Sequence, residues 1–168
     1  LLLNFGNRRN HLPVYWAAAK QHFDCLQLLV NAGYVIHSSA LSAAASLGNI
    51  LYLRYLVDHL PLMAGGTKPY IDSSITQCAA INGHVECFTY LLSVEWRFEL
   101  QTLHTVIASG QHQCLKVLID GNYPRDIQAT FHAANYNCYE CLELLLIANY
   151  EIHHQALAAA ISKRHHRC

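Results

Sequence analysis

The sequence repeats with a period of 27 residues, and this period constrains the fold more than any other feature. Cysteine recurs at this interval at Cys87, Cys114, Cys141 and Cys168. Cys25 and Tyr52 are also 27 residues apart, and the 35 residues from Tyr52 to Cys87 imply one insertion of eight, near residues 61–73. A leucine-rich segment begins at each such position from Cys25 to Cys141. A fixed period of this length in several copies predicts a solenoid.

Each unit contains two predicted helices. An alanine-rich segment, such as residues 17–19, 43–45, 79–80 or 133–134, precedes most of the leucine-rich ones. The leucine-rich segment places apolar residues such as Leu26, Leu29 and Val30 on one face at helical spacing. Between the two segments stand Gly48-Asn49, Gly83-His84 and Gly110-Gln111, which predict tight turns because glycine tolerates positive φ. The sequence therefore predicts an all-α solenoid of about six helix-turn-helix units.

The second helix of a unit is predicted to end in a residue that adopts the left-handed conformation, at Gly33, Asn122 and Asn149. An aromatic residue follows at equivalent positions: Tyr34, Trp96, Tyr123 and Tyr150. These aromatic side chains form either the apolar contact that accompanies such a cap or a recognition stripe. We favour the cap contact.

The repeats run through residues 1–168 as a single array. Residues 1–6 align with residues 28–33, the end of a second helix, and Cys168 aligns with the start of another. A complete solenoid carries terminal capping units with a polar outer face, and neither end of this sequence has that character. We therefore expect a fragment of a longer array.

Residues 79–92 read Ala-Ala-Ile-Asn-Gly-His-Val-Glu-Cys-Phe-Thr-Tyr-Leu-Leu. This segment resembles the ankyrin repeat, in which an alanine pair and a glycine-histidine turn precede a leucine-rich helix, and Leu103-His104 resembles the end of its Thr-Pro-Leu-His motif. The resemblance implies stacked helix pairs, a non-catalytic protein-binding function, and histidines at the turns that tie adjacent repeats together: His22, His84 and His165. The usual repeat has about 33 residues and a β-hairpin between helix pairs, so the shorter period predicts a hairpin-poor form.

Charge and composition exclude several classes of function. The chain has 11 basic and 11 acidic residues, so no broad attraction to nucleic acid or to an anionic membrane is expected. The basic run at residues 163–167 is interpreted as a solvated helix segment. No apolar stretch reaches the roughly 18 residues that a membrane span needs. The seven cysteines lie in apolar helical segments, which predicts reduced thiols and an intracellular protein of the cytoplasm or nucleus.

Two groups of residues suggest chemistry, and the repeat explains both more simply. Cys138 and Cys141 form a CxxC at a helix start that would suit a redox pair, but Cys141 occupies the recurring apolar cysteine position. Potential zinc ligands gather near the end of the sequence: His153, His154, His165, His166 and Cys168. They do not form the two close-spaced ligand pairs of a structural zinc site. We expect no metal site, no cofactor and no catalytic centre.

A solenoid presents the variable residues of its first helices on an extended concave surface. Two positions in each unit qualify: the one directly before the alanine pair, and the one two residues after it. From these positions and the inter-repeat loops we predict the partner-binding residues Trp16, Lys20, Asn82, Arg97, Thr105, Arg125, His132 and Tyr136. Large side chains at such positions concentrate binding energy, although Trp16 could instead shield an end of the array and Tyr136 could pack on a neighbouring helix.

We therefore expect a monomeric protein-protein interaction module that binds a protein or peptide on its concave face. One alternative is a structural spacer that positions another domain of a larger protein. Another is a non-catalytic regulatory part of an enzyme.

Overall fold

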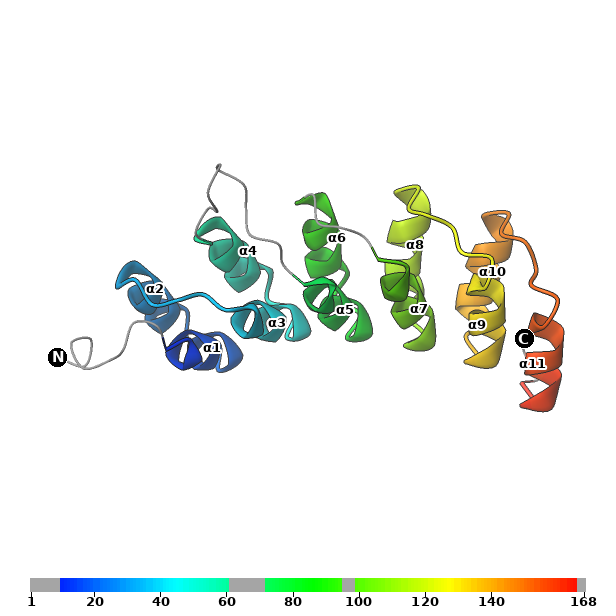
Figure 1. The fold of residues 1–168 in the computed structure, drawn as a ribbon, viewed down its shortest axis with the longest axis horizontal. Coiled ribbons are helices and arrows are strands. Elements are labelled where there is room, and N and C mark those ends of the chain that lie inside the picture. The colour runs from blue at the N-terminus through cyan, green and yellow to red at the C-terminus, as the bar shows by residue number, and fades with distance from the viewer. Residues whose placement is uncertain (1–9, 61–71, 95–98, 166–168) are drawn as a thin grey trace.

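The computed structural model describes residues 10–60, 72–94 and 99–165, which form α-helices joined by turns and loops (Figure 1). The helices are α1 (Leu12–Ala19), α2 (Phe23–Asn31), α3 (Ser38–Ser46), α4 (Ile50–Asp58), α5 (Ser73–Ile81), α6 (Val85–Ser93), α7 (Leu100–Ala108), α8 (His112–Asp120), α9 (Ala129–Asn135), α10 (Tyr139–Ile147) and α11 (Ala156–Ser162). The described residues thus contain five helix pairs and one further first helix, as an all-α solenoid requires. None of the helices described here is long and apolar enough to cross a membrane.

The predicted insertion falls almost entirely outside the described residues. Residues 61–71 are not among them, and Ser73 is already the first residue of α5, with Asp72 as its N-cap.

The helices form two rows that run the length of the molecule (Figure 1). The first helices of the units, α1, α3, α5, α7, α9 and α11, form one row, and the second helices, α2, α4, α6, α8 and α10, form the other. Each first helix packs against the first helix of the next unit, and those from α1 to α9 also pack against the second helix of their own unit. The rows bend gently, and the first-helix row lies on the inner side of the bend (Figure 1).

Small side chains let neighbouring first helices approach closely. The alanines of the repeat, such as Ala44, Ala79 and Ala133, are fully buried between units. Larger side chains of the second helices, such as Leu53 and Phe88, belong to the same continuous core. Helices of seven to nine residues are marginal in isolation, so the packing of one unit on the next supplies most of the stability.

The turn between the two helices of a unit has a residue with positive φ in each described unit: Gln21, Gly48, Gly83, Gly110, Asn137 and Arg164. At Gly48 the N–H donates to the Ala45 carbonyl (3.2 Å), and the next N–H, of Asn49, donates to the Ala44 carbonyl (3.0 Å). This pair of hydrogen bonds is the Schellman pattern, which satisfies carbonyl groups that the end of a helix leaves open. The predicted glycine turns are confirmed, and three units adopt the same turn without glycine.

The second helices also end in left-handed residues as predicted, at Gly33, Asn122 and Asn149. The tyrosines that follow are buried in the core or packed against it: Tyr34, Tyr123 and Tyr150. The cap-contact interpretation is therefore confirmed for these three residues, whereas Trp96 lies outside the described residues.

Histidines from one unit bind the turn of the unit before it. His84 Nε2 donates to the Ser46 carbonyl oxygen at 2.9 Å, and His165 Nδ1 donates to the Ala134 carbonyl oxygen at 2.8 Å. Both carbonyl groups lie near the C-terminal end of a first helix, where regular intrahelical partners run out. The structural role expected for these two histidines is confirmed. His22 belongs to the first described unit, before which no unit is described.

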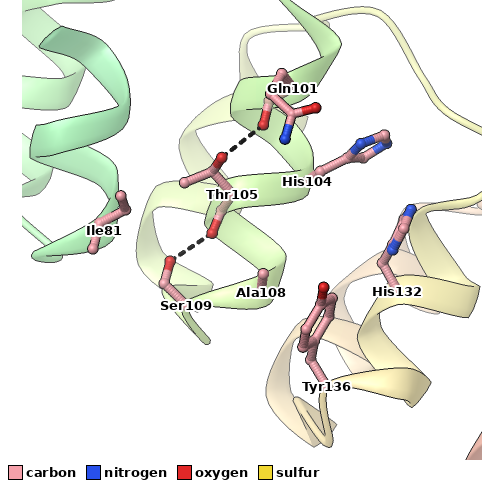
Figure 2. A pocket seen from close by; sticks show the side chains of 8 residues that line it. All are labelled: Ile81, Gln101, His104, Thr105, Ala108, Ser109, His132 and Tyr136. Carbon is pink, nitrogen blue, oxygen red and sulfur yellow. Dashed lines mark hydrogen bonds between the residues drawn. The ribbon is translucent and has the colours of Figure 1, made fainter. Parts of the chain in front are cut away.

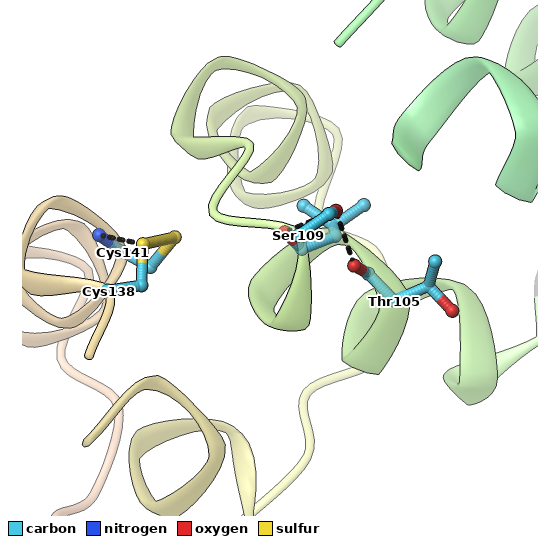
Figure 3. The surroundings of a disulfide bond; sticks show 5 residues. Thr105, Ser109, Cys138 and Cys141 are labelled. Carbon is cyan, nitrogen blue, oxygen red and sulfur yellow. Dashed lines mark hydrogen bonds between the residues drawn. A yellow bond between two sulfur atoms is a disulfide. The ribbon is translucent and has the colours of Figure 1, made fainter. Parts of the chain in front are cut away.

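Cys138 and Cys141 form a disulfide in the structure (Figure 3). The prediction that all seven cysteines are reduced is therefore wrong for this pair. Cys138 is the N-cap of α10 and Cys141 lies in its first turn, so the spacing of one helical turn brings the two side chains together. Both are buried, and Cys138 Sγ also accepts a hydrogen bond from the Cys141 N–H at 3.3 Å.

The remaining described cysteines are free thiols: Cys25, Cys78, Cys87 and Cys114. Cys87 and Cys114 are fully buried, and burial raises the pKa of each thiol to about 11. These two residues therefore act as small apolar side chains, as their place in the repeat predicts.

Gly48→Ala is expected to destabilise the array more than Gly110→Ala. Both glycines have positive φ, 68° and 71°, so either substitution costs about 1–2 kcal/mol through the backbone. A Cβ at Gly110 would meet open space, whereas a Cβ at Gly48 would lie 2.8 Å from Cε1 and Cγ of the His84 ring. Displacing that ring leaves the Ser46 carbonyl without its partner, which adds about 1–3 kcal/mol. Urea unfolding followed by circular dichroism measures both losses, and equal losses would contradict this account.

Candidate functional site

A groove of about 520 Å³ opens on the first-helix row between α5, α7 and α9 (Figure 2). Its lining residues are Ile81, Gln101, His104, Thr105, Ala108, Ser109, His132 and Tyr136. The members from α7 recur once in each helical turn, three or four residues after the previous turn's members, so a single face of that helix forms the floor. His132 and Tyr136 lie one turn apart on the α9 side, and Ile81 ends α5 on the other side.

The groove offers mainly apolar contact. Its hydroxyl groups are turned back onto α7: Thr105 Oγ1 donates to the Gln101 carbonyl at 2.8 Å, and Ser109 Oγ donates to the Thr105 carbonyl at 2.6 Å (Figure 2). Ile81 and Tyr136, in contrast, remain 50% and 52% exposed. Exposed apolar walls above a floor whose hydroxyls are already bonded favour a ligand that brings apolar side chains.

A second groove, of about 440 Å³, lies on the same row between α1 and α3. Tyr15, Ala19, Ser42 and Leu47 are among its lining residues. Trp16 follows Tyr15 and is 53% exposed, with its ring centroid 5.2 Å from that of Tyr15.

The eight predicted partner-binding residues fall into separate groups. Thr105, His132 and Tyr136 line the groove between α5 and α9 together. Asn82 lies at the C-terminal end of α5, exposed, and its Nδ2 donates to the Cys78 carbonyl at 2.8 Å. Tyr136 is more than half exposed, although its ring also stacks on His132 with centroids 6.3 Å apart.

The other predicted residues lie elsewhere. Trp16 and Lys20 are at the far end of the row, where the Lys20 ammonium lies 5.9 Å from the Trp16 ring centroid. Arg125 lies over the Tyr150 ring at 4.9 Å and donates to the Asn149 carbonyl at 3.3 Å, so it belongs to a loop surface rather than to the groove. Arg97 lies outside the described residues.

Sequence reasoning missed Ile81, Gln101 and His104, which also line the groove. It considered only two positions in each first helix. The face of α7 that forms the floor also includes residues one turn earlier, and helical spacing from Thr105 to Gln101 was the available signal.

A polar residue makes a capping bond at one repeated position before five of the six described first helices. The side chains of Asn10, His37, Asp72, Asp126 and His153 each accept a hydrogen bond from the backbone N–H two residues later, at 3.0–3.3 Å. Such a bond satisfies one of the donors that the start of a helix leaves open. The repeat therefore fixes the place of Asp126 beside α9.

Asp126 and His104 join two adjacent units. Asp126 Oδ2 is hydrogen-bonded to His104 Nε2, while Oδ1 accepts from the Gln128 N–H at 3.1 Å. Burial alone would raise the pKa of Asp126, but the hydrogen bonds from His104 and Gln128 outweigh it and hold the pKa below 3.8. The carboxylate is therefore ionised near neutral pH.

His132 completes this cluster from α9. Its ring centroid lies 4.4 Å from that of His104, and both rings border the groove (Figure 2). Burial, and then the neighbouring His104, lower the pKa of His132 below 6.5, against the opposing effect of Asp126. Its neutral form is therefore favoured near neutral pH.

Of the potential zinc ligands near the end of the sequence, His153, His154 and His165 are described, and these three do not form a metal-binding group. His165 is bonded to the Ala134 carbonyl, and the rings of His153 and His154 lie beside each other with centroids 4.3 Å apart. Residues 166–168, with His166 and Cys168, lie outside the described residues.

The family model described as ankyrin repeats (3 copies) matches residues 14–102 and 76–156. The chain belongs to the ankyrin repeat family. The crystal structure of the human ASB11 ankyrin repeat domain is similar, with a TM-score of 0.68 at 19% sequence identity over 88% of this chain and 76% of that one. A likeness at this identity shows the fold, and it confirms the predicted solenoid. No curated protein sequence matches the chain.

Ankyrin repeats are generally protein-protein interaction modules and typically non-catalytic scaffolds. This ankyrin array has short units. The connection from α2 to α3 is residues 32–37 only, and no β-strand occurs among the described residues. The prediction of a hairpin-poor form is therefore confirmed for the described connections.

Asp126→Ala is expected to destabilise the array more than Asp72→Ala. Both aspartates cap a first helix in the same way, and loss of a cap costs about 1 kcal/mol. Asp126 also bonds His104 of the preceding unit, and loss of that partly buried bond adds about 0.5–1.5 kcal/mol. Urea unfolding of both variants in metal-free buffer measures the difference. Equal losses would mean that the bond to His104 contributes nothing to stability.

Proposed function

We propose that this ankyrin array binds a protein or peptide partner in the groove between α5 and α9. The observation that carries the proposal is the exposure of Ile81 and Tyr136, 50% and 52%, on either side of a floor of satisfied hydroxyl groups. Aromatic and aliphatic side chains that stay half exposed at a concave site supply binding energy when a partner covers them. Thr105 and His132, both predicted from the sequence, line the space between these walls.

The ligand favoured by this geometry is a chain segment with an apolar side chain flanked by polar groups. The apolar side chain would lie between Ile81 and Tyr136. Gln101, exposed at the N-terminal end of the floor, has an amide that can bond the ligand backbone. The second groove, beside Trp16, lies on the same row and would extend the contact along the solenoid.

Three further features of the proposal rest on composition and thiols. Equal numbers of basic and acidic residues, 11 of each, favour a protein ligand over nucleic acid. We propose that the array acts as a monomer, without catalytic activity and without a membrane as a binding partner. Four described cysteines are free thiols, which supports an intracellular location that a tagged chain in source cells would test.

A paired substitution tests the groove. Residues 1–168 serve as bait in a source-cell lysate beside an Ile81→Ala, Tyr136→Ala variant. The matched control is Leu28→Ala, Leu51→Ala, which removes equally exposed apolar side chains from the second-helix row, where Leu28 and Leu51 are 59% and 68% exposed. All three baits must show the same helicity by circular dichroism.

The expected result is a captured protein that the control variant retains and the groove variant loses. Loss of each anchoring side chain should weaken binding by about 30-fold, since a hot-spot residue contributes about 2 kcal/mol, so loss of both should weaken it by about 30-fold to 900-fold. Titration of the captured protein against the three baits measures this factor. Equal retention by both variants would place the contact outside the groove. Capture by none of the baits would favour the structural-spacer alternative.

A further inference from the structure

Three side chains that commonly bind metal ions converge at the edge of the groove. His104 comes from α7, Asp126 from the loop before α9, and His132 from α9 itself. One donor atom of each lies within 4.8 Å of the other two. We propose that His104, Asp126 and His132 together bind a divalent transition-metal ion of the zinc class. The sequence led us to expect no metal site, because the potential ligands near its end do not form two close-spaced pairs.

The geometry needs little adjustment to accept an ion. A tetrahedral zinc ion with bonds of about 2.0–2.1 Å holds its donor atoms about 3.4 Å apart. The donors of His104 and Asp126 are closer than this because they share a hydrogen bond. The ion would take the place of the Nε2 proton of His104: a neutral ring then carries its proton on Nδ1, and a protonated ring keeps the Nδ1 proton and releases the other to water. Rotation of the side chains would bring His132 into range.

His132 has a buried ring nitrogen, Nε2, for which the protein provides no hydrogen-bond partner among the described residues. Buried ring nitrogens normally have a partner, so this atom is poised for a ligand that the protein alone does not provide. Asp126, in turn, is oriented by the bond from the Gln128 N–H to its Oδ1, as outer-shell bonds commonly orient carboxylate ligands.

The solenoid itself does not require this cluster. One unit earlier, the equivalent positions hold Gln77, Glu99 and Thr105, and one unit later they hold Phe131, His153 and Ala159. Those units form the same kind of helices without a second donor set among the described residues. Only the capping role of Asp126 follows from the repeat, so the two histidines beside it call for a separate explanation.

The donor types indicate which ion would bind. Two imidazoles and one carboxylate suit Zn²⁺ and its first-row neighbours, whereas Ca²⁺ and Mg²⁺ prefer oxygen ligands. Three protein ligands leave one position of a tetrahedral ion open. Because His104 and His132 both line the groove, that position is accessible to water or to a donor side chain of a bound partner.

Metal titration of the chain alone tests the proposal. Calorimetric titration of Zn²⁺ into residues 1–168 is compared with the variants His132→Gln and Asp126→Asn, with Mg²⁺ as the negative probe. Asp126→Asn keeps a side-chain oxygen for the Gln128 N–H, so the cap persists while the charged ligand is lost. His112→Gln, which changes an exposed histidine outside the cluster, is the matched control. If His132→Gln does not fold, Asp126→Asn and His104→Gln decide.

We expect the parent and the control to bind one Zn²⁺ ion. The cluster variants should not bind it, or should bind it at least about tenfold more weakly. Zn²⁺ should also raise the melting temperature of the parent and the control but not that of the cluster variants. Substitution by Co²⁺ should give tetrahedral visible bands without thiolate charge transfer. Unchanged affinity in the cluster variants, a thiolate band, or no binding at micromolar Zn²⁺ would overturn the proposal. Because no partner is present, its failure would leave the proposed protein-binding function untouched.

Discussion

Neighbouring units of this solenoid are joined at their turns, where in three described places a side chain of one unit binds the end of a helix in the unit before it. The His84 ring lies against Gly48 and donates to the Ser46 carbonyl, so glycine is required there both for its positive φ and for the space that it leaves. Gln111 makes the equivalent bond to the Ile81 carbonyl at 3.1 Å. The bond can thus be made by any side chain with a suitably placed N–H donor. Helices of nine residues are marginal in isolation, so they depend on such contacts together with the packing of one unit on the next.

Most of the fold could be predicted because stacking imposes the same demands on every unit. The helix pairs, the left-handed turn residues and the buried alanines all recur at the period, and the structure confirms them. A polar cap also recurs at one position before five of the described first helices, yet it is filled by Asn10, His37, Asp72, Asp126 and His153 in turn. Several residue types can accept the same N–H bond, so the capping role recurs at this position although the residue type changes. The Cys138–Cys141 disulfide was missed because the repeat accounts for Cys141 as a recurring apolar residue, and that explanation was preferred to a redox pair.

The candidate site was only partly predictable, because function uses the positions that stacking leaves unspecified. Thr105, His132 and Tyr136 were found since they occupy the two variable positions that face inward in every unit. His104 was not, because its importance comes from Asp126, which is 22 residues later in the chain and belongs to the next unit. Such pairs depend on the lateral offset between neighbouring units, which the period alone does not determine. Arg125 was predicted to contact a partner as a loop charge, but in the structure it lies over the Tyr150 ring.

The short unit also determines where function can lie. The usual ankyrin repeat has about 33 residues, and the extra length forms a hairpin that can reach a partner. In this array the connection from α2 to α3, residues 32–37, consists of a helix cap, a core tyrosine and the cap of the next helix. Few loop residues remain free of a structural task, which favours the first-helix row for the proposed partner contact. Asp126 serves two purposes: its Oδ1 accepts the capping bond that recurs in the repeat, and its Oδ2 bonds His104 at the edge of the groove. A recurring structural position thereby becomes a distinctive one through the identity of the residues placed around it.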